Sequence, residues 1–483
     1  MNTNSMMSKN KNIFIKIIFH NFCFLFIFDN CILSQEIPSG FWNKDLIEIM
    51  LDAGKNWNEN STIHDILHKN EPQYNNLEEN SLDSRLGYKS FLLNKNNSFS
   101  VFNFSRFTFK NKFYSYIYAR FARQPEGLSG FTGISQEISR FGLRAGELDM
   151  AGLGFVNNNF LIQYGRGRAS SGAGQNIALV LGNSSSSYDH MTLGFKTDRL
   201  KTRYFHGFLE NINDVNRYLV GKSIEWTFTD FTLFSLSEFT IYSGFNRPFD
   251  IAYLNPVSSH LEIEFNEKAN RPKKDSGNAA WQFAFDTMIK NNFRFSSNYV
   301  IDELIIDKSQ LDSGKVNGLA YSARLAWTPN SKNYIVSYNI FLIHVGSLTF
   351  KHEDGYNNFV SRNLPLGWIY GSDGDEIGFG FKLFNKKNIF TELAFKKIRL
   401  GEGSVLTNPY IGYTSYSSNK FPSGLINDIN SIELTFSFLQ KENITFSTFF
   451  KYENYNNTVN NSLNLCIQYK HKHSFYKKEF KNH

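Results

Sequence analysis

The chain has 483 residues, of which 49 are Phe, 24 are Tyr and only 10 are Pro. Its formal net charge of +7 is small for this length and is spread along the chain, so the composition does not indicate a nucleic-acid-binding protein. Beyond residue 34 there is no run of about 18 apolar residues, which excludes a protein that crosses a membrane with helices. The length fits several globular domains or one large barrel.

The N-terminus has the composition of an export signal. Three lysines precede a short apolar core that contains FCFLFIF, residues 22–28, and Ser34 follows as a small residue. This order predicts a signal peptide over residues 1–34, and an uncleaved membrane anchor is the alternative. Cleavage near Ser34 leaves Cys466 as the one cysteine of the mature chain, which rules out an intramolecular disulfide and a cysteine metal cluster.

Residues 35–95 differ from the rest of the chain. Over residues 41–57, FWNKDLIEIMLDAGKNW, apolar residues recur at helical spacing, and Gly54 indicates a helix end. STIHDILHK, residues 61–69, has the features of a second helix start, with a hydroxyl side chain as its cap. The remainder is polar. We therefore expect a small helical cap followed by a linker, and a frayed N-terminal arm is the alternative.

Residues 96–472 alternate between apolar and polar side chains in segments of about ten residues. In SIELTFSFLQ, residues 431–440, the apolar residues Ile432, Leu434 and Phe436 stand between Ser, Glu and Thr. The same period of two returns in residues 112–122, 333–344, 376–384, 443–452 and 462–470. A period of two predicts strands with one apolar and one polar face. Residues 473–483 then form a basic tail.

Short turns separate many of these predicted strands, which is typical of transmembrane β-barrels. In lipid every backbone polar group must be paired within the sheet, so the sheet must close. We predict an all-β fold, an antiparallel outer-membrane barrel of about 18 strands whose apolar face meets hydrocarbon. The alternative is a soluble sandwich or propeller, but the chain shows neither an internal repeat nor a blade signature.

Long polar stretches interrupt the strand pattern, at residues 125–146, 169–189, 244–278, 354–375 and 401–428. In outer-membrane barrels the long connections are extracellular. We expect a surface ligand to be bound there, because loops carry most binding residues.

Several segments together resemble the Wzi-like capsule assembly proteins of the bacterial outer membrane. They are residues 45–54, DLIEIMLDAG; 164–189, the Gly/Arg-rich stretch before a Leu-rich segment; 236–256, which ends in Tyr-Leu-Asn-Pro; 299–307, YVIDELIID; and 363–381, NLPLGWIYGSDGDEIGFGF. The resemblance implies a barrel whose residues 35–95 form a helical periplasmic plug and a linker. It also implies a lectin that binds capsular or exopolysaccharide at the cell surface, without catalysis.

Candidate polysaccharide contacts lie in two of these segments. Arg166 and Arg168 alternate around Gly167, with Gln175 nearby, and guanidinium groups bind the carboxylates of acidic sugars. The alternative is that these arginines line the lumen and pair with carboxylates across the barrel.

The second candidate group surrounds a predicted strand end. Glu238 and Tyr242 lie on the strand, and Arg247, Tyr253 and Asn255 follow on its loop. Planar polar groups and aromatic faces are the partners that sugar rings need. The alternative is that the tyrosine and its neighbours merely pack the loop onto the barrel.

An enzyme is not indicated. The chain contains neither GxSxG nor HExxH, and its histidines show no metal spacing, so we predict no catalytic residue, no metal site and no cofactor. The acidic turn at residues 373–376 raises a calcium hypothesis but is short for a complete oxygen cage. We expect a monomer in contact with outer-membrane lipid and polysaccharide, without nucleic acid. A sugar-specific porin is the main alternative, and an outer-membrane hydrolase with a Ser/His pair is the third.

Overall fold

The computed structural model describes residues 41–474 apart from residues 56, 58–59, 65–79, 94–95, 111, 125–130, 132–133, 175, 184, 267, 269–276, 306–307, 313, 386–387, 414–419, 441–442 and 457. The predicted signal peptide, residues 1–34, and residues 475–483 of the predicted tail lie outside the described residues. In the described part no helix is long and apolar enough to span a bilayer.

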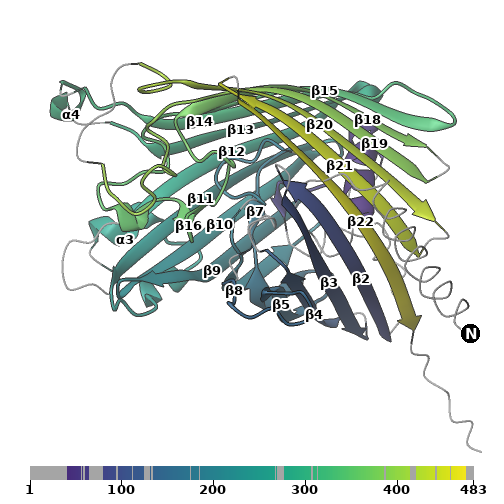
Figure 1. Ribbon diagram of the computed structural model, residues 1–483. Coiled ribbons are helices and arrows are strands. Elements are labelled where there is room, and N and C mark those ends of the chain that lie inside the picture. Colours follow the sequence, from purple (N-terminus) through teal and green to yellow (C-terminus); the bar gives the residue numbers. More distant parts are fainter. Residues whose placement is uncertain are drawn as a thin grey trace, which may run out of the picture.

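The fold is a closed antiparallel barrel of 18 strands, as the alternating sequence pattern predicts (Figure 1). The strands are β2 (Asn80–Leu93), β3 (Asn96–Phe109), β4 (Phe113–Ala122), β5 (Ala145–Val156), β6 (Phe160–Gly167), β8 (Tyr188–Lys196), β9 (Leu200–Ile212), β10 (Val215–Thr229), β11 (Thr232–Phe245), β12 (Gly277–Ile289), β13 (Phe293–Glu303), β14 (Gly318–Trp327), β15 (Tyr334–Val345), β18 (Gly374–Asn385), β19 (Ile389–Leu400), β20 (Asn427–Gln440), β21 (Ile444–Tyr455) and β22 (Thr458–Ser474). Each strand pairs with its neighbour in sequence, and β22 pairs with β2 to close the sheet.

Smaller elements lie outside the barrel sheet. They are α2 (Phe41–Asp52), β1 (Ile63–His64), β7 (Ser170–Ser171), η4 (Ile251–Leu254), α3 (His260–Phe265), η5 (Lys290–Asn292), α4 (Lys308–Asp312), η6 (Gly355–Asn357), β16 (Val360–Ser361) and β17 (Leu364–Pro365). The prediction of a helix in residues 41–57 is confirmed by α2. Gly54 follows it with a φ of +67°, the left-handed conformation that commonly ends helices.

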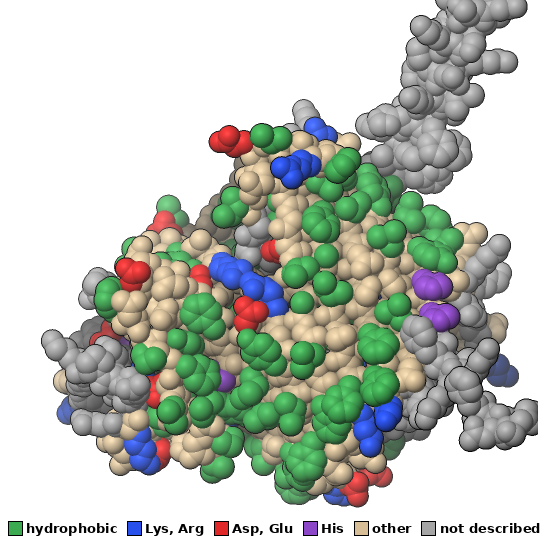
Figure 2. All heavy atoms as spheres, turned by 90° about the horizontal axis from the view of Figure 1, so that it is seen from below, with side chains coloured by type: hydrophobic (Ala, Val, Ile, Leu, Met, Phe, Trp, Pro, Cys, Tyr) green, Lys and Arg blue, Asp and Glu red, His purple; other side chains and the backbone are tan. Residues whose placement is uncertain are grey.

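The alternating side chains face opposite environments. On β20 the apolar Ile432, Leu434 and Phe436 are exposed on the outer face, whereas Ser431 and Ser437 are buried inside. Figure 2 shows hydrophobic side chains spread over the outer wall. In water so large an exposed apolar surface would be unfavourable, but in a bilayer these side chains meet acyl chains. The fold and its outer face define a bacterial outer-membrane barrel.

The long connections all leave the same rim of the barrel. They span residues 123–144, 168–187, 246–276, 304–317, 346–373 and 401–426, and the opposite rim carries short turns. Barrels of this class place short turns in the periplasm and long loops outside the cell. The predicted polar stretches therefore correspond to surface loops, with 304–317 as an additional loop that the sequence pattern did not reveal.

Two expectations about the N-terminal segment are corrected. The barrel begins with β2 at Asn80, within the region expected to be a linker, rather than at residue 96. This strand points Asp83, Arg85 and Lys89 inward, so its pattern has little hydrophobic contrast. The expected second helix is not formed at its start, because residues 63–64 form β1, which pairs with β7.

Two surface loops fold into the lumen and form a hydrophobic core there. Residues 168–187 contribute Ile177 and Leu179, which are fully buried against residues of loop 346–373 and inward side chains of the wall. The loops are joined by backbone hydrogen bonds from Gly182 to the carbonyl of Leu366 at 2.7 Å and from Trp368 to the carbonyl of Leu179 at 3.1 Å. Each such buried aliphatic side chain stabilises the packing by about 1.5–3 kcal/mol.

Candidate functional site

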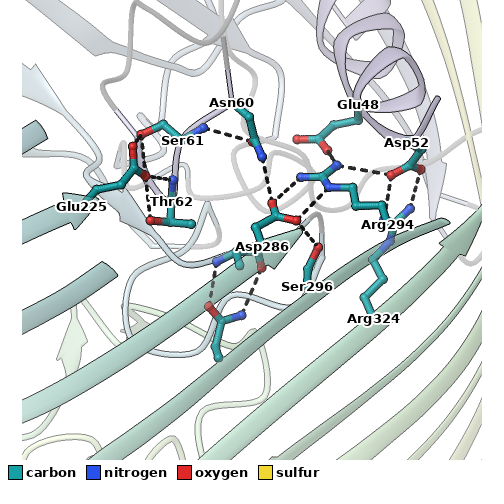
Figure 3. A network of polar contacts seen from close by, with 12 residues as sticks. Glu48, Asp52, Asn60, Ser61, Thr62, Glu225, Asp286, Arg294, Ser296 and Arg324 are labelled. Carbon is teal, nitrogen blue, oxygen red and sulfur yellow. Dashed lines mark hydrogen bonds and ion pairs between the residues drawn. The ribbon is translucent and has the colours of Figure 1, made fainter. Parts of the chain in front are cut away.

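Helix α2 lies inside the barrel against β15, β18 and β19, and it begins a segment that we call the plug, residues 41–64. Glu48 and Asp52 lie on one helix face, because they are four residues apart. Both point to arginines of the wall (Figure 3). Asp52 accepts two hydrogen bonds from Arg324, at 2.7 and 2.8 Å, and one from the Ser337 hydroxyl at 2.9 Å.

Arg294 of β13 connects the helix to the next part of the plug. Its guanidinium lies 3.2 Å from a carboxylate oxygen of Glu48 and of Asp52, and it donates two hydrogen bonds to Asp286 at 2.7 and 3.0 Å. Asp286 also accepts a hydrogen bond from the Asn60 side chain at 3.0 Å. All these groups are buried, and each charge is paired, which is the condition under which buried charges are tolerated.

Glu225 of β10 holds the other end of the plug. It accepts hydrogen bonds from the Thr62 backbone N–H, from the Thr62 hydroxyl at 2.7 Å and from the Ser61 hydroxyl at 3.0 Å. The Lys201 ammonium lies 3.1 Å from the same carboxylate. The hydroxyl residues expected to cap a second helix therefore bind the wall instead.

The charge of Asp52 is fixed by its surroundings. Burial raises the pKa of this carboxyl, but the charges of Arg324 and Arg294 outweigh burial and lower the pKa to about 2. Asp52 is consequently ionised at neutral pH. The polar network and the loop core above it both lie inside the barrel and occupy part of its lumen.

The two predicted arginines do not act together, because β6 ends at Gly167 and the alternation stops there. Arg166 faces outward near the surface rim and lies 3.0 Å from Asp189, with both side chains partly exposed. Arg168 turns inward, is buried, and donates hydrogen bonds to Asp149 at 2.6 and 2.8 Å. It therefore has the lumen-facing, carboxylate-paired position that the sequence left as the alternative. Gln175 lies outside the described residues.

The second predicted group is brought together, but on the outer wall. Tyr242 and Tyr253 stack with ring centroids 4.5 Å apart and planes 5° from parallel, and Arg247 lies 4.6 Å from the Tyr242 ring. Glu238 accepts the backbone N–H of His260 at 3.0 Å. These side chains are buried between strands and a covering segment that we call the apron, residues 246–266.

Asn255 lies on the exposed side of the apron. Its side chain donates to the Ser258 hydroxyl at 2.7 Å and accepts from the backbone of Val257 at 3.1 Å. It borders a cavity of about 370 Å³ that is also lined by Asp250, Ile251, Ala252, Ser258, Ile263 and Lys268. Asn255 is the one member of this second predicted group that an outside ligand reaches.

The three carboxylates of the acidic turn at residues 373–376 do not point toward a common centre. Asp373 is buried and accepts hydrogen bonds from Ser347, Ser423 and the backbone of Gly403. Asp375 pairs with an arginine on the outer face, and Glu376 accepts the indole N–H of Trp368 inside the barrel. Among the described residues no three His, Cys, Asp or Glu side chains are grouped to hold a metal ion.

The surface mouth of the barrel carries tyrosines that the sequence reasoning did not select. The Tyr410 hydroxyl donates to Glu210 at 3.1 Å, and Arg217 lies 5.1 Å from its ring centroid. Burial and the Glu210 charge raise the pKa of Tyr410 to about 12, so the phenol keeps its proton.

Tyr413 has a similar setting on the same loop. The Lys315 ammonium lies 5.5 Å from its ring centroid and pairs with Glu303, to which the Tyr413 hydroxyl donates at 3.4 Å. Both tyrosines are partly exposed. The signal in the sequence was the closely spaced tyrosines in residues 408–416, NPYIGYTSY, within a stretch already expected to be extracellular.

One comparison with a solved structure supports the class of fold. The chain is similar to Wzi, described as an outer membrane protein involved in group 1 capsule assembly in Escherichia coli and a carbohydrate-binding β-barrel, with a TM-score of 0.59 and 12% identity over 92% of this chain and 98% of that one. It also resembles OprD of Pseudomonas aeruginosa, with a TM-score of 0.47 and 10% identity over 82% of this chain and 95% of that one. No protein-family model matches the chain. No curated protein matches it either.

Proposed function

We propose that this protein is a Wzi-like lectin of the outer membrane, which binds capsular or exopolysaccharide at its surface rim and holds it on the cell without catalysis. The observation that carries the proposal is the protein packed inside the lumen. The surface loops 168–187 and 346–373 pack into a hydrophobic core, and the plug is fixed below them by buried ion pairs. A porin needs a water-filled path, and these side chains stand where that path would run.

The contact surface in this proposal is the mouth of the barrel. Tyr410 and Tyr413 offer aromatic faces beside charged and hydroxyl groups, which is the combination that sugar rings bind. Arg166 and Asn255 are proposed as further contacts because they are accessible. The buried members of the predicted set, Arg168, Glu238, Tyr242, Arg247 and Tyr253, are proposed to position the loops rather than touch sugar.

Binding of purified surface polysaccharide to the barrel in detergent tests the proposal. We expect Tyr413→Ala to weaken binding about two- to tenfold, because an aromatic contact is worth about 0.5–1.5 kcal/mol beyond its buried area and 1.4 kcal/mol is a factor of ten. Tyr334→Ala is the matched control, since Tyr334 is an exposed tyrosine at the short-turn rim. Steady ion conductance through the intact protein in a planar bilayer, with no polysaccharide binding, would support the porin instead.

A further inference from the structure

The apron covers part of the outer face of the barrel wall. The uncovered parts of this face meet lipid in a barrel of this class. The side chains beneath the apron lie on the same face as the exposed Ile224, Trp226 and Phe234, at alternating positions of β9, β10 and β11. They are Tyr204, His206, Tyr218, Lys222, Glu238 and Tyr242. The apolar lumen core lies on the opposite side of these strands, through Phe205, Leu219 and Phe239. The covered patch is thus polar and aromatic within an otherwise apolar outer face.

The inner side of the apron pairs these polar groups. The Lys222 ammonium donates a hydrogen bond to the backbone carbonyl of Ser258. The Tyr204 hydroxyl donates one to the backbone carbonyl of Tyr253 at 3.1 Å. The backbone N–H of Asp250 donates to the Tyr242 hydroxyl at 3.2 Å. A lysine left open to the middle of the bilayer costs about 2–4 kcal/mol, so the apron removes a penalty that the bare wall would carry.

The outer side of the apron is apolar. Ile251, Val257 and Phe265 are 76%, 88% and 79% exposed, and Leu261 and Phe249 are exposed beside them. Exposed apolar patches mark binding surfaces. This one lies on the outer side of the wall, as do the exposed Ile224, Trp226 and Phe234. Its Ile251 lines the same cavity as Asp250, Asn255, Ser258 and Lys268.

We infer that the apron is immersed in the outer leaflet and binds a membrane lipid there. The acyl chains lie on Ile251, Val257 and Phe265, and the polar headgroup lies at the cavity beside Asn255. An amphipathic molecule fits because apolar side chains and polar groups adjoin on one surface. Lipid is the occupant because the apron lies over the outer face of β9, β10 and β11, and the outer face of a barrel of this class meets lipid. Asn255 is shared with the proposed polysaccharide contacts, but the apolar residues of the apron are not, so the test below does not depend on polysaccharide binding.

Spin-label accessibility tests the inference on the full chain, folded into phosphatidylcholine vesicles, in a background with Cys23, Cys31 and Cys466 replaced by alanine. A nitroxide at Val257→Cys is compared with one at Ile224→Cys on the lipid-facing wall and one at Asn363→Cys, which is exposed at the mouth. The ratio of collisions with oxygen to collisions with a water-soluble nickel chelate distinguishes lipid from water.

If the apron lies in lipid, the ratio measured at position 257 resembles the ratio at the lipid-facing position 224. It then differs from the ratio at position 363, which is exposed at the mouth. A ratio nearer to that at 363 places the apron in water and overturns the inference. Phe265→Cys repeats the measurement at a second apron position, so that failure of one variant to fold leaves the question answerable. With no other protein in the vesicles, a lipid-like ratio cannot come from a protein partner.

Discussion

Asp52→Asn is the sharpest perturbation of the plug, because it removes one charge without changing the side-chain shape. Both hydrogen bonds from Arg324 end on Asp52, whereas Arg294 keeps Asp286 and Glu48. Loss of one partner of a buried ion pair costs about 3–5 kcal/mol. Taking the lower figure, about 3 kcal/mol, the equilibrium between the docked and released helix shifts about 100-fold toward release.

Hydrogen exchange measured by mass spectrometry on peptides from residues 41–54 reports this equilibrium. Amides of α2 exchange from the released helix, so we expect their exchange to accelerate about 100-fold in Asp52→Asn. Exchange in the barrel strands should change little. Asp189→Asn is the control, since the Arg166–Asp189 pair is partly exposed and worth at most about 1 kcal/mol. Unchanged exchange in α2 would show that apolar packing, rather than the ion pairs, holds the plug.

Three further predictions concern the plug and the loops above it. Because the folded pKa of Asp52 is about 2, below its ordinary 3.8, its contribution to plug stability is complete above about pH 4 and is lost as the pH falls to about 2; exchange in α2 measured from pH 7 downward checks this. Gly367→Ala places a Cβ 1.7 Å from the Leu179 carbonyl oxygen, and we expect it to destabilise the protein by about 3 kcal/mol, seen as a lower melting temperature. Arg168→Ala leaves Asp149 with one fewer partner and should increase exchange in residues 168–187, whereas Arg166→Ala should change it little.

The barrel was predictable because hydrophobic contrast between its two faces is strong. Ile432 and its neighbours must meet lipid, so a period of two survives along nearly every strand. The pattern failed at β2, where Asp83, Arg85 and Lys89 point inward and small or polar residues share the outer face. It failed also at residues 61–64, where partners distant in sequence, such as Glu225, replace the helix cap that local rules expect.

The candidate site was less predictable, because it depends on where strands end and on which face a loop covers. Arg166 and Arg168 diverge because the strand stops between them. Tyr242 and Tyr253 do meet, yet the sequence could not reveal that their loop folds over the outside of the wall. The plug contacts had a local signal in the sequence, since the acids Glu48 and Asp52 are four residues apart and lie on one face of the helix.

The pairing of β1 with β7 has a mechanical meaning. Ile63 pairs with Ser171, and the backbone N–H of Gly172 donates to the Thr62 carbonyl at 2.8 Å. The plug is thereby tied, inside the barrel, to a loop that starts at the long-loop rim. A force that pulls loop 168–187 outward must either break the pairing of β1 with β7 or act on the plug and on its contacts with Glu225. This short pairing thus couples a loop of the long-loop rim to the plug inside the barrel.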